Sequence, residues 1–159
     1  MATSTDMAFA KHAYTAFLTA LDERGWSYNR NDDELRIEIG VTGEDLPMDL
    51  IMRIDTKYQI IRLQSLIPFK MPDDKIIHGS IATNHINYSL AAGSFDYDAG
   101  DGTIAFRLVQ SFRNTYISSK ICSYMIDVSC LTIDKYNDML FMLGKGHMEL
   151  SEFIEKINS

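Results

Sequence analysis

Several features that mark other protein classes are scarce in this chain. Its 159 residues include only two cysteines and three prolines, and Lys and Arg number 15 against 22 Asp and Glu, which gives a net charge of −7. Nucleic-acid binding depends on Lys and Arg that neutralise phosphates, and here the basic residues are scattered. The sequence therefore predicts no nucleic-acid partner and no binding to an anionic membrane surface.

Long hydrophobic runs are also absent. A helix that spans a bilayer needs about 18 or more apolar residues in a row, and the N-terminus lacks the basic region and apolar core of a secretory signal. Cys122 and Cys130 lie eight positions apart in a predicted helix, or about 12 Å along its axis, which is too far for a disulfide. We expect two buried thiols in a reducing, cytoplasmic setting.

Motifs that carry catalysis are missing too. There is no Gly-x-Ser-x-Gly, no Walker-type phosphate loop and no Gly-x-Gly-x-x-Gly. Zinc sites use closely spaced pairs such as His-Glu-x-x-His or Cys-x-x-Cys, whereas the histidines are spread over positions His12, His78, His85 and His147. The sequence predicts no catalytic residues, no metal and no cofactor, and hence a protein that is not an enzyme.

One acidic segment, Asp96–Gly102, has the composition of a calcium loop. An EF-hand loop needs an oxygen ligand at position 5, glycine at 6 and glutamate at 12. Counting from Asp96 places Gly100, Asp101 and Arg107 at those positions, so the register fails. Asp-Gly between two alternating strands instead predicts a hairpin turn, because glycine supplies the positive φ that the turn requires.

The first half of the chain predicts a helix followed by strands. Asp6 is the expected N-cap of a helix over Asp6–Arg24, and Gly25 ends it. Period-2 alternation then predicts Trp26–Arg30, a turn at Asn31–Glu34, Leu35–Ile39, a loop over Gly40–Pro47, Met48–Ile54, a tight turn at Asp55–Lys57, and Tyr58–Phe69. Only Met1–Thr5 look disordered.

The second half predicts a helix from Asp73 or Asp74 to about Leu90, a hairpin, a long helix and a short one. Ile77, Ile81, His85 and Tyr88 share one side of the first of these helices. The long helix, Tyr116–Gly144 with Ser118 or Ser119 as N-cap, repeats apolar or small residues every three to four positions: Cys122, Ile126, Ser129, Ile133, Tyr136, Leu140 and Leu143. The last helix covers Leu150–Asn158.

This order predicts an α+β fold with an antiparallel sheet, a β-meander plus a hairpin packed against helices. We expect one domain over residues 1–159. The segment Tyr58–Phe69 carries apolar residues on both faces, since Leu66 and Ile67 point opposite ways. Such a strand either lies centrally under two layers or offers one face to a partner.

Three pieces of the sequence resemble the YbjN-like family of bacterial proteins, whose domain is similar to the type III secretion chaperones. The pieces are Asn84-His-Ile-Asn87, Gly93-Ser-Phe-Asp-Tyr-Asp98 and Asp101-Gly-Thr-Ile-Ala-Phe-Arg107. The resemblance implies an α+β domain that is often dimeric, with a role in regulation or in chaperone-like protein binding. It implies no catalytic residues.

The sequence and the resemblance together favour a non-enzymatic protein-binding module that acts as a homodimer on an unknown protein partner. The expected adhesive residues are Leu63, Ile67 and Phe69, or the methionines Met48 and Met52, because flexible thioethers repack around varied partners. Core filling is the alternative reading of the methionines. A second hypothesis is a small-molecule binder or enzyme with a pocket formed by Asn84, His85 and Asn87.

Overall fold

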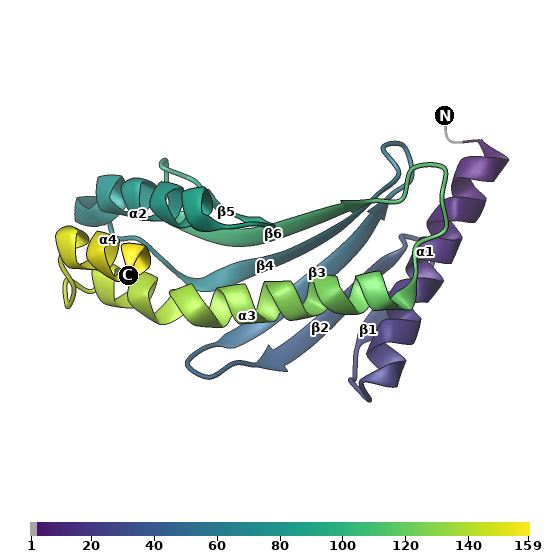
Figure 1. The fold of residues 1–159 in the computed structure, drawn as a ribbon, viewed down its shortest axis with the longest axis horizontal. Coiled ribbons are helices and arrows are strands. Elements are labelled where there is room, and N and C mark those ends of the chain that lie inside the picture. Colours follow the sequence, from purple (N-terminus) through teal and green to yellow (C-terminus); the bar gives the residue numbers. More distant parts are fainter. Residues whose placement is uncertain (1–2) are drawn as a thin grey trace.

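The computed structural model describes residues 3–159, and Met1 and Ala2 lie outside the described residues. Its elements (Figure 1) are α1 (Ser4–Glu23), β1 (Asn29–Asn31), β2 (Arg36–Thr42), β3 (Pro47–Asp55), β4 (Ile60–Lys70), the 3-10 turn η1 (Asp73–Lys75), α2 (Ile76–Ser89), β5 (Ser94–Tyr97), β6 (Thr103–Ser111), α3 (Ser119–Gly144) and α4 (Leu150–Asn158). Ser4 and Thr5 are helical, so the prediction of disorder is wrong for them.

Six strands form one antiparallel sheet in the order β1-β2-β3-β4-β6-β5. The first four are a meander, and β6 joins it by pairing with β4, where Leu63 lies opposite Leu108. The β5–β6 hairpin, which follows α2 in the chain, therefore extends the sheet beyond β4. The predicted α+β class is confirmed, and the predicted loop over Gly40–Pro47 is shorter, since it covers only residues 43–46.

One face of the sheet is covered and the other is open. The long helix α3 runs along the covered face and α1 crosses the end of the sheet (Figure 1). On β4, Ile61, Leu63 and Ile67 are buried, whereas Arg62 and Leu66 between them are exposed. Because successive side chains of a strand point to opposite faces, this alternation assigns every strand residue to the core or to the open face.

The ends of α1 are set by local hydrogen bonds. Thr3 is the N-cap: its hydroxyl accepts from the Asp6 N–H at 3.1 Å and its own N–H donates to the Asp6 carboxylate at 2.8 Å. Asp6 is therefore the third helical residue of a capping box and not the N-cap that the sequence predicted. At the other end Gly25 has φ +67°, and the Trp26 N–H donates to the Leu21 carbonyl at 3.1 Å. Trp26 thus belongs to the helix end, and the strand predicted from it begins only at Asn29.

The long helix α3 begins at Ser119, and not at Tyr116 as the sequence predicted. Ser118 is its N-cap, because its hydroxyl accepts from the Ile121 N–H at 3.3 Å. The stripe predicted from the sequence is confirmed, since all of its members are buried: Cys122, Ile126, Ser129, Ile133, Tyr136, Leu140 and Leu143. No described helix is both long enough and apolar enough to cross a membrane.

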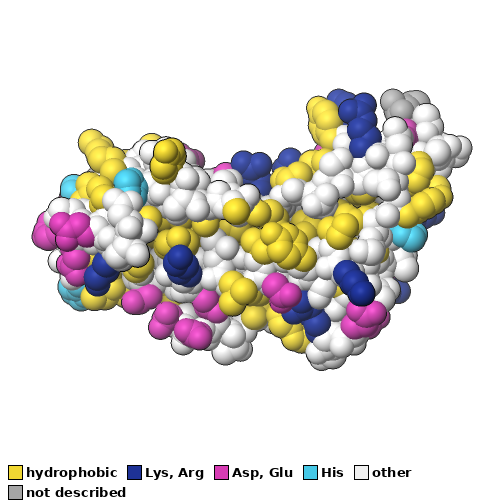
Figure 2. Space-filling view, in the orientation of Figure 1, with side chains coloured by type: hydrophobic (Ala, Val, Ile, Leu, Met, Phe, Trp, Pro, Cys, Tyr) yellow, Lys and Arg dark blue, Asp and Glu magenta, His cyan; other side chains and the backbone are white. Residues whose placement is uncertain are grey.

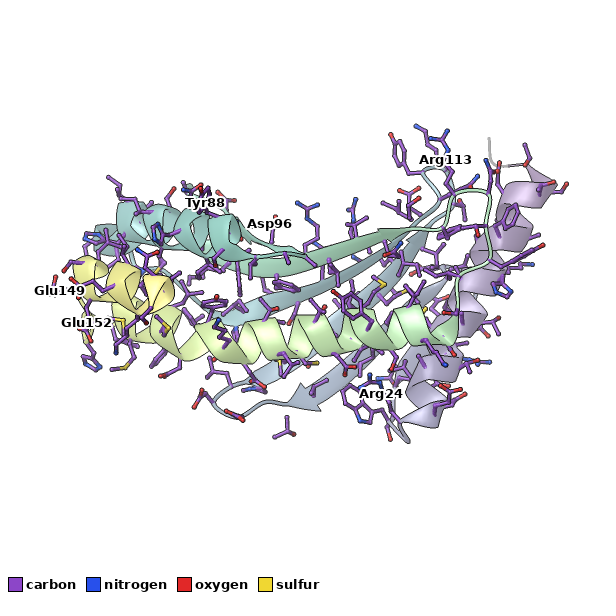
Figure 3. The ribbon with its side chains drawn as sticks, viewed as in Figure 1. Arg24, Tyr88, Asp96, Arg113, Glu149 and Glu152 are labelled. Atoms are coloured by element: carbon purple, nitrogen blue, oxygen red, sulfur yellow. The ribbon has the colours of Figure 1, made fainter. Side chains whose placement is uncertain are left out.

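A polar contact fastens α1 to α3 at the edge of the core. The Arg24 guanidinium, labelled in Figure 3, donates to the Ser123 hydroxyl at 2.6 Å and lies 2.8 Å from a carboxylate oxygen of Asp127. Arg24 also lies over the Trp26 ring, 5.3 Å from its centroid. The guanidinium thus joins the end of the first helix to the start of the long one.

At the far end of the sheet α2 and α4 lie together, and the two chain ends are at opposite ends of the molecule (Figure 1). Gly79 lets α2 approach closely, because a Cβ there would come within 2.5 Å of the Tyr97 hydroxyl oxygen and 2.6 Å of the Met71 Cγ. That hydroxyl donates to the Ile76 carbonyl at 2.7 Å. The helix α4 has the bounds that the sequence predicted, and it buries Phe153.

The face assignment on β4 predicts a difference between adjacent residues. We expect Ile67→Ala to lower the free energy of unfolding by about 2–4 kcal/mol, because it removes a fully buried side chain. Leu66→Ala, on the open face, is expected to change it by about 0.5 kcal/mol or less. Urea unfolding followed by circular dichroism measures both. Equal losses for the two variants would show that the faces are assigned wrongly.

Candidate protein-binding surface

The residues that the sequence singled out as adhesive lie on the covered face. Leu63 and Met52 are 0% exposed, Met48 is 2% and Ile67 is 3%. Phe69 is half-buried, with its ring centroid 5.3 Å from that of Phe141 on α3. Four of the five are thus core residues, and the expectation of an adhesive face there is corrected: period-2 alternation separates the two sides of a strand but does not say which side the helices cover.

The opposite side of the sheet is open to solvent. Its central strands present Arg53, Arg62, Leu66 and Val109, and all four side chains are exposed. Leu66 and Val109 are large apolar residues with exposures of 62% and 39%. Among the described strand residues, no side chain on this face is buried. No helix packs there, so the open face is available to another molecule.

The helix α2 turns an apolar side to solvent. Ile77 is 72% exposed, Ile81 41% and Tyr88 92%. These residues lie one or more whole turns apart, which places them on one side of the helix. The buried side consists instead of Gly79, Ala82, Thr83 and Ile86. Hydrophobic side chains therefore protrude from α2 into solvent (Figure 2). Tyr88, one of them, is labelled in Figure 3. We call Ile77, Ile81 and Tyr88 the α2 stripe.

A second apolar stripe runs along the outside of α3. Ile121 is 40% exposed, Tyr124 57% and Leu131 70%, and the spacing of three and seven again places them on one side. Figure 2, in which α3 faces the viewer, shows hydrophobic side chains gathered along this helix. We call Ile121, Tyr124 and Leu131 the α3 stripe. Exposed apolar side chains that share one side of a helix are candidates for an interaction site.

Asn87 hydrogen-bonds to the edge strand β5. Its side-chain amide donates to the Phe95 carbonyl at 2.9 Å, and its side-chain oxygen accepts from the Phe95 N–H at 2.7 Å. Both backbone groups of this edge residue are thereby satisfied by a side chain, as they would be by another strand. An unpaired strand edge is a template for aggregation, so the role of Asn87 is structural.

The other members of the predicted small-molecule pocket do not converge. Asn84 is exposed, and a ring nitrogen of His85 lies 3.0 Å from the Asn158 side-chain oxygen on α4. With Asn87 bonded to Phe95, the three side chains face different neighbours. The pocket expected from Asn84, His85 and Asn87 is therefore not formed, because Asn87 is bonded to β5, His85 contacts α4 and Asn84 is open to solvent.

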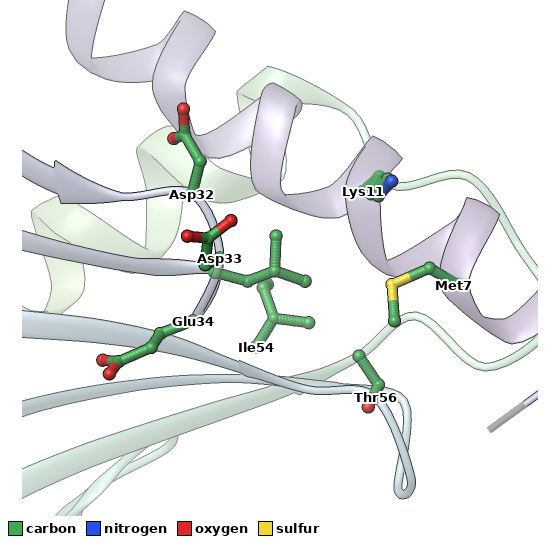
Figure 4. A pocket seen from close by; sticks show the side chains of 8 residues that line it. Met7, Lys11, Asp32, Asp33, Glu34, Ile54 and Thr56 are labelled. Atoms are coloured by element: carbon green, nitrogen blue, oxygen red, sulfur yellow. The ribbon is translucent and has the colours of Figure 1, made fainter. Parts of the chain in front are cut away.

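Hollows occur instead where α1 meets the turn between β1 and β2. Two adjoining cavities of about 410 and 530 Å³ share Lys11, Asp32, Asp33 and Leu35 in their walls (Figure 4). The Tyr14 hydroxyl donates to Asp32 at 2.8 Å. Burial, together with this hydrogen bond to a carboxylate, raises the pKa of Tyr14 to about 12. The phenol therefore stays protonated at neutral pH and supplies no general base.

The thiols are equally unreactive. Cys122 is buried and Cys130 half-buried, so the expected burial is complete for the first only. Burial raises the pKa of Cys122 to about 12 and that of Cys130 to about 11. The thiolate is the nucleophilic form of cysteine, and it is scarce at neutral pH for both. Within residues 3–159 no group of three or more His, Cys, Asp or Glu is placed to hold a metal.

The fold was compared with those of known proteins. No protein-family model matches the chain. A search of curated proteins finds no significant relative. Among solved structures, YbjN from E. coli, described as a proposed transcription regulator, superposes with a TM-score of 0.57 at 12% identity, over 84% of this chain and 92% of YbjN. The fold is that of YbjN.

Two further solved structures share this fold. A chain of the HopA1–SchA chaperone–effector complex gives a TM-score of 0.50 at 12% identity, over 78% of this chain and 91% of that one. A chain of the ExsC–ExsE complex gives 0.53 at 6% identity, over 82% and 95%. The fold implied by the sequence resemblance is therefore confirmed.

The two asparagines of the resembling segment provide a test of the role of Asn87 at the sheet edge. Asn87→Ala removes both hydrogen bonds to Phe95, so we expect the free energy of unfolding to fall by about 1–3 kcal/mol and the Phe95 amide to exchange faster with solvent. Asn84→Ala, on an exposed turn of the same helix, is the matched control and is expected to change neither. Hydrogen exchange monitored by NMR distinguishes the two, and unchanged protection of Phe95 in Asn87→Ala would contradict the assignment.

Proposed function

We propose that the chain is a non-enzymatic protein-binding module, chaperone-like or regulatory, that acts as a homodimer and as one domain over residues 1–159. The observation that carries this proposal is the pair of exposed apolar stripes on α2 and α3, on a fold shared with a chaperone–effector complex. Exposed apolar side chains gathered on one side of a helix are candidates for burial against another protein. Because the two stripes lie on different helices, one can contact a second copy of the chain and the other a partner protein.

The α2 stripe is the proposed contact between two copies. A two-fold interface is self-complementary, since the same residues of both subunits meet across the axis. Ile77 and Tyr88 near the two ends of α2 are largely exposed, so antiparallel α2 helices would bury Tyr88 of each copy near Ile77 of the other. The α3 stripe then remains for the partner protein.

The chemistry of the described side chains supports a binding role over catalysis. The phenol of Tyr14 and both thiols are held in their protonated forms. Both cysteines are free, which agrees with a reducing compartment such as the cytoplasm. We infer a cytoplasmic protein that acts by contact and not by reaction.

The homodimer is tested with charge in the α2 stripe. We expect the wild-type protein to sediment as a dimer and Ile77→Glu/Tyr88→Glu to sediment as a monomer, because an unpaired carboxylate buried in an interface weakens association by about a hundredfold or more. Leu131→Glu, an equal change on α3, is the control and should remain dimeric. A monomeric wild type, or a dimer that survives both substitutions, would rule out this interface.

The partner is tested by capture of the tagged protein from the lysate of its own host. We expect one protein to co-purify near stoichiometry, and Tyr124→Glu/Leu131→Glu to lose it because the charges disrupt an apolar contact. Quantitative mass spectrometry gives the ratio, and circular dichroism checks that the variant is folded. A clean preparation with no partner would count against the binding-module function.

A further inference from the structure

Three arginines form a row across the open face of the sheet. Arg36 of β2 lies opposite Arg53 of β3, and Arg53 lies opposite Arg62 of β4. Neighbouring strands are about 4.8 Å apart, so three positive side chains start side by side. Like charges placed directly opposite one another destabilise a sheet. We call Arg36, Arg53 and Arg62 the arginine row.

Two arginines on this face are paired with carboxylates, but the other two, which belong to the row, are not. Arg36 is paired with Glu38, and Arg107 is paired with Asp96 at 2.6 Å. Arg53 and Arg62 form no salt bridge with any residue that the structure describes, and both are exposed. In a chain with a net charge of −7, this leaves a local concentration of unneutralised positive charge.

The two unneutralised arginines border a hollow. A cavity of about 300 Å³ is lined by Arg53, Ile54, Asp55, Thr56 and Arg62. The Asp55 carboxylate in this wall accepts the Tyr58 N–H at 2.9 Å and keeps its negative charge, so the two guanidinium groups outnumber it. The cavity therefore offers guanidinium groups to an incoming anion.

Further positive charge lies at the same end of the sheet. The loop after β6 is tied to the β3–β4 turn, because the Asn114 N–H donates to the Gln59 side-chain oxygen at 2.9 Å. This contact brings Arg113 beside that turn, where Figure 3 shows it standing out from the surface. Acidic residues Glu149 and Glu152 lie at the other end of the molecule (Figure 3).

Apolar side chains accompany the arginine row on the same face. Val109 continues the row, because it lies opposite Arg62 on β6, and Leu66 is on the same side of β4. Their exposures are 39% and 62%. A ligand that fits this surface therefore combines anionic groups with apolar ones.

We propose that the arginine row binds an acidic segment of a partner protein, with carboxylates on Arg53 and Arg62 and apolar side chains on Leu66 and Val109. Arginine holds carboxylates through paired, charge-assisted hydrogen bonds. Two unpaired arginines suit a short acidic segment and not a nucleic acid, whose affinity grows with the number of phosphates neutralised. This inference rests on the proposed protein-binding function and names the chemistry of the segment that is bound.

The test uses a fluorescein-labelled peptide rich in glutamate and leucine, with the same peptide carrying glutamine in place of glutamate as the matched ligand. Fluorescence anisotropy should show that the acidic peptide binds the wild-type protein and that the affinity falls as salt is raised. Arg62→Glu is expected to weaken binding about tenfold or more. Lys120→Glu, the same reversal of charge at an exposed site on α3, is expected to leave it unchanged.

A stability measurement guards against misfolding of the variant. Because the arginine row is self-repelling, Arg53→Gln and Arg62→Glu are expected to keep or raise the midpoint of thermal unfolding. A loss of peptide binding with an unchanged or higher midpoint would therefore be a loss of contacts and not of structure.

Several outcomes would overturn the inference. Two of them concern the peptide: the acidic and glutamine peptides bind equally, or wild type and Arg62→Glu bind the acidic peptide equally. A third is that a duplex oligonucleotide binds in place of the peptide. A fourth is that Arg62→Glu dissociates the homodimer, which would make a second copy the occupant. If a partner is captured from the lysate equally well by wild type and Arg62→Glu, the protein-binding function stands and only the arginine row is misassigned. If no partner is captured, the function itself fails.

Discussion

The packing of α3 and α1 against one face of the sheet governs the rest of this molecule. With 26 residues, α3 is about 39 Å long at 1.5 Å per residue, enough to lie across most of the strands. Its buried stripe and the inward residues of the strands form one hydrophobic core. Every strand residue that does not join this core is left on the open face, so the surface offered to other molecules follows from where the long helix lies.

A sheet covered on one face only leaves its edges to be protected. At one end the edge strand β1 has just three residues, which is too short to recruit another chain. At the other end Asn87 satisfies both backbone groups of Phe95. Both are means by which proteins avoid edge-to-edge association. Association through helix stripes or through the open face, and not through strand edges, is therefore the mode that this architecture favours.

The fold shared with YbjN and with a chain of the HopA1–SchA chaperone–effector complex leaves the two helix stripes and the open face of this chain exposed. The exposed surfaces are of two chemical kinds. The α2 and α3 stripes are both apolar with one tyrosine each, whereas the open face combines arginine with leucine and valine. Different surfaces allow a protein to meet a second copy of itself and a partner without competition between the two contacts.

Local patterns in the sequence were enough to predict much of this fold. The buried stripe of α3, the helix end at Gly25, the bounds of α4 and the Asp-Gly hairpin all depend on residues close together in the chain, whose geometry follows from helix periodicity or from the backbone freedom of glycine. The resemblance of residues 84–107 to YbjN-like proteins predicted the α+β fold.

Long-range packing decided the candidate surfaces. The sequence shows that Leu66 and Ile67 point opposite ways, but only the position of α3 makes Ile67 core and Leu66 surface. On α2 the larger side chains Ile77 and Tyr88 are exposed because Gly79 and Ala82 allow the closer approach to its neighbours. The arginine row arises from strand register, which aligns residues 36, 53 and 62 across three strands. Periodicity carries no information on register or on which face is covered, since both are properties of contacts between distant segments.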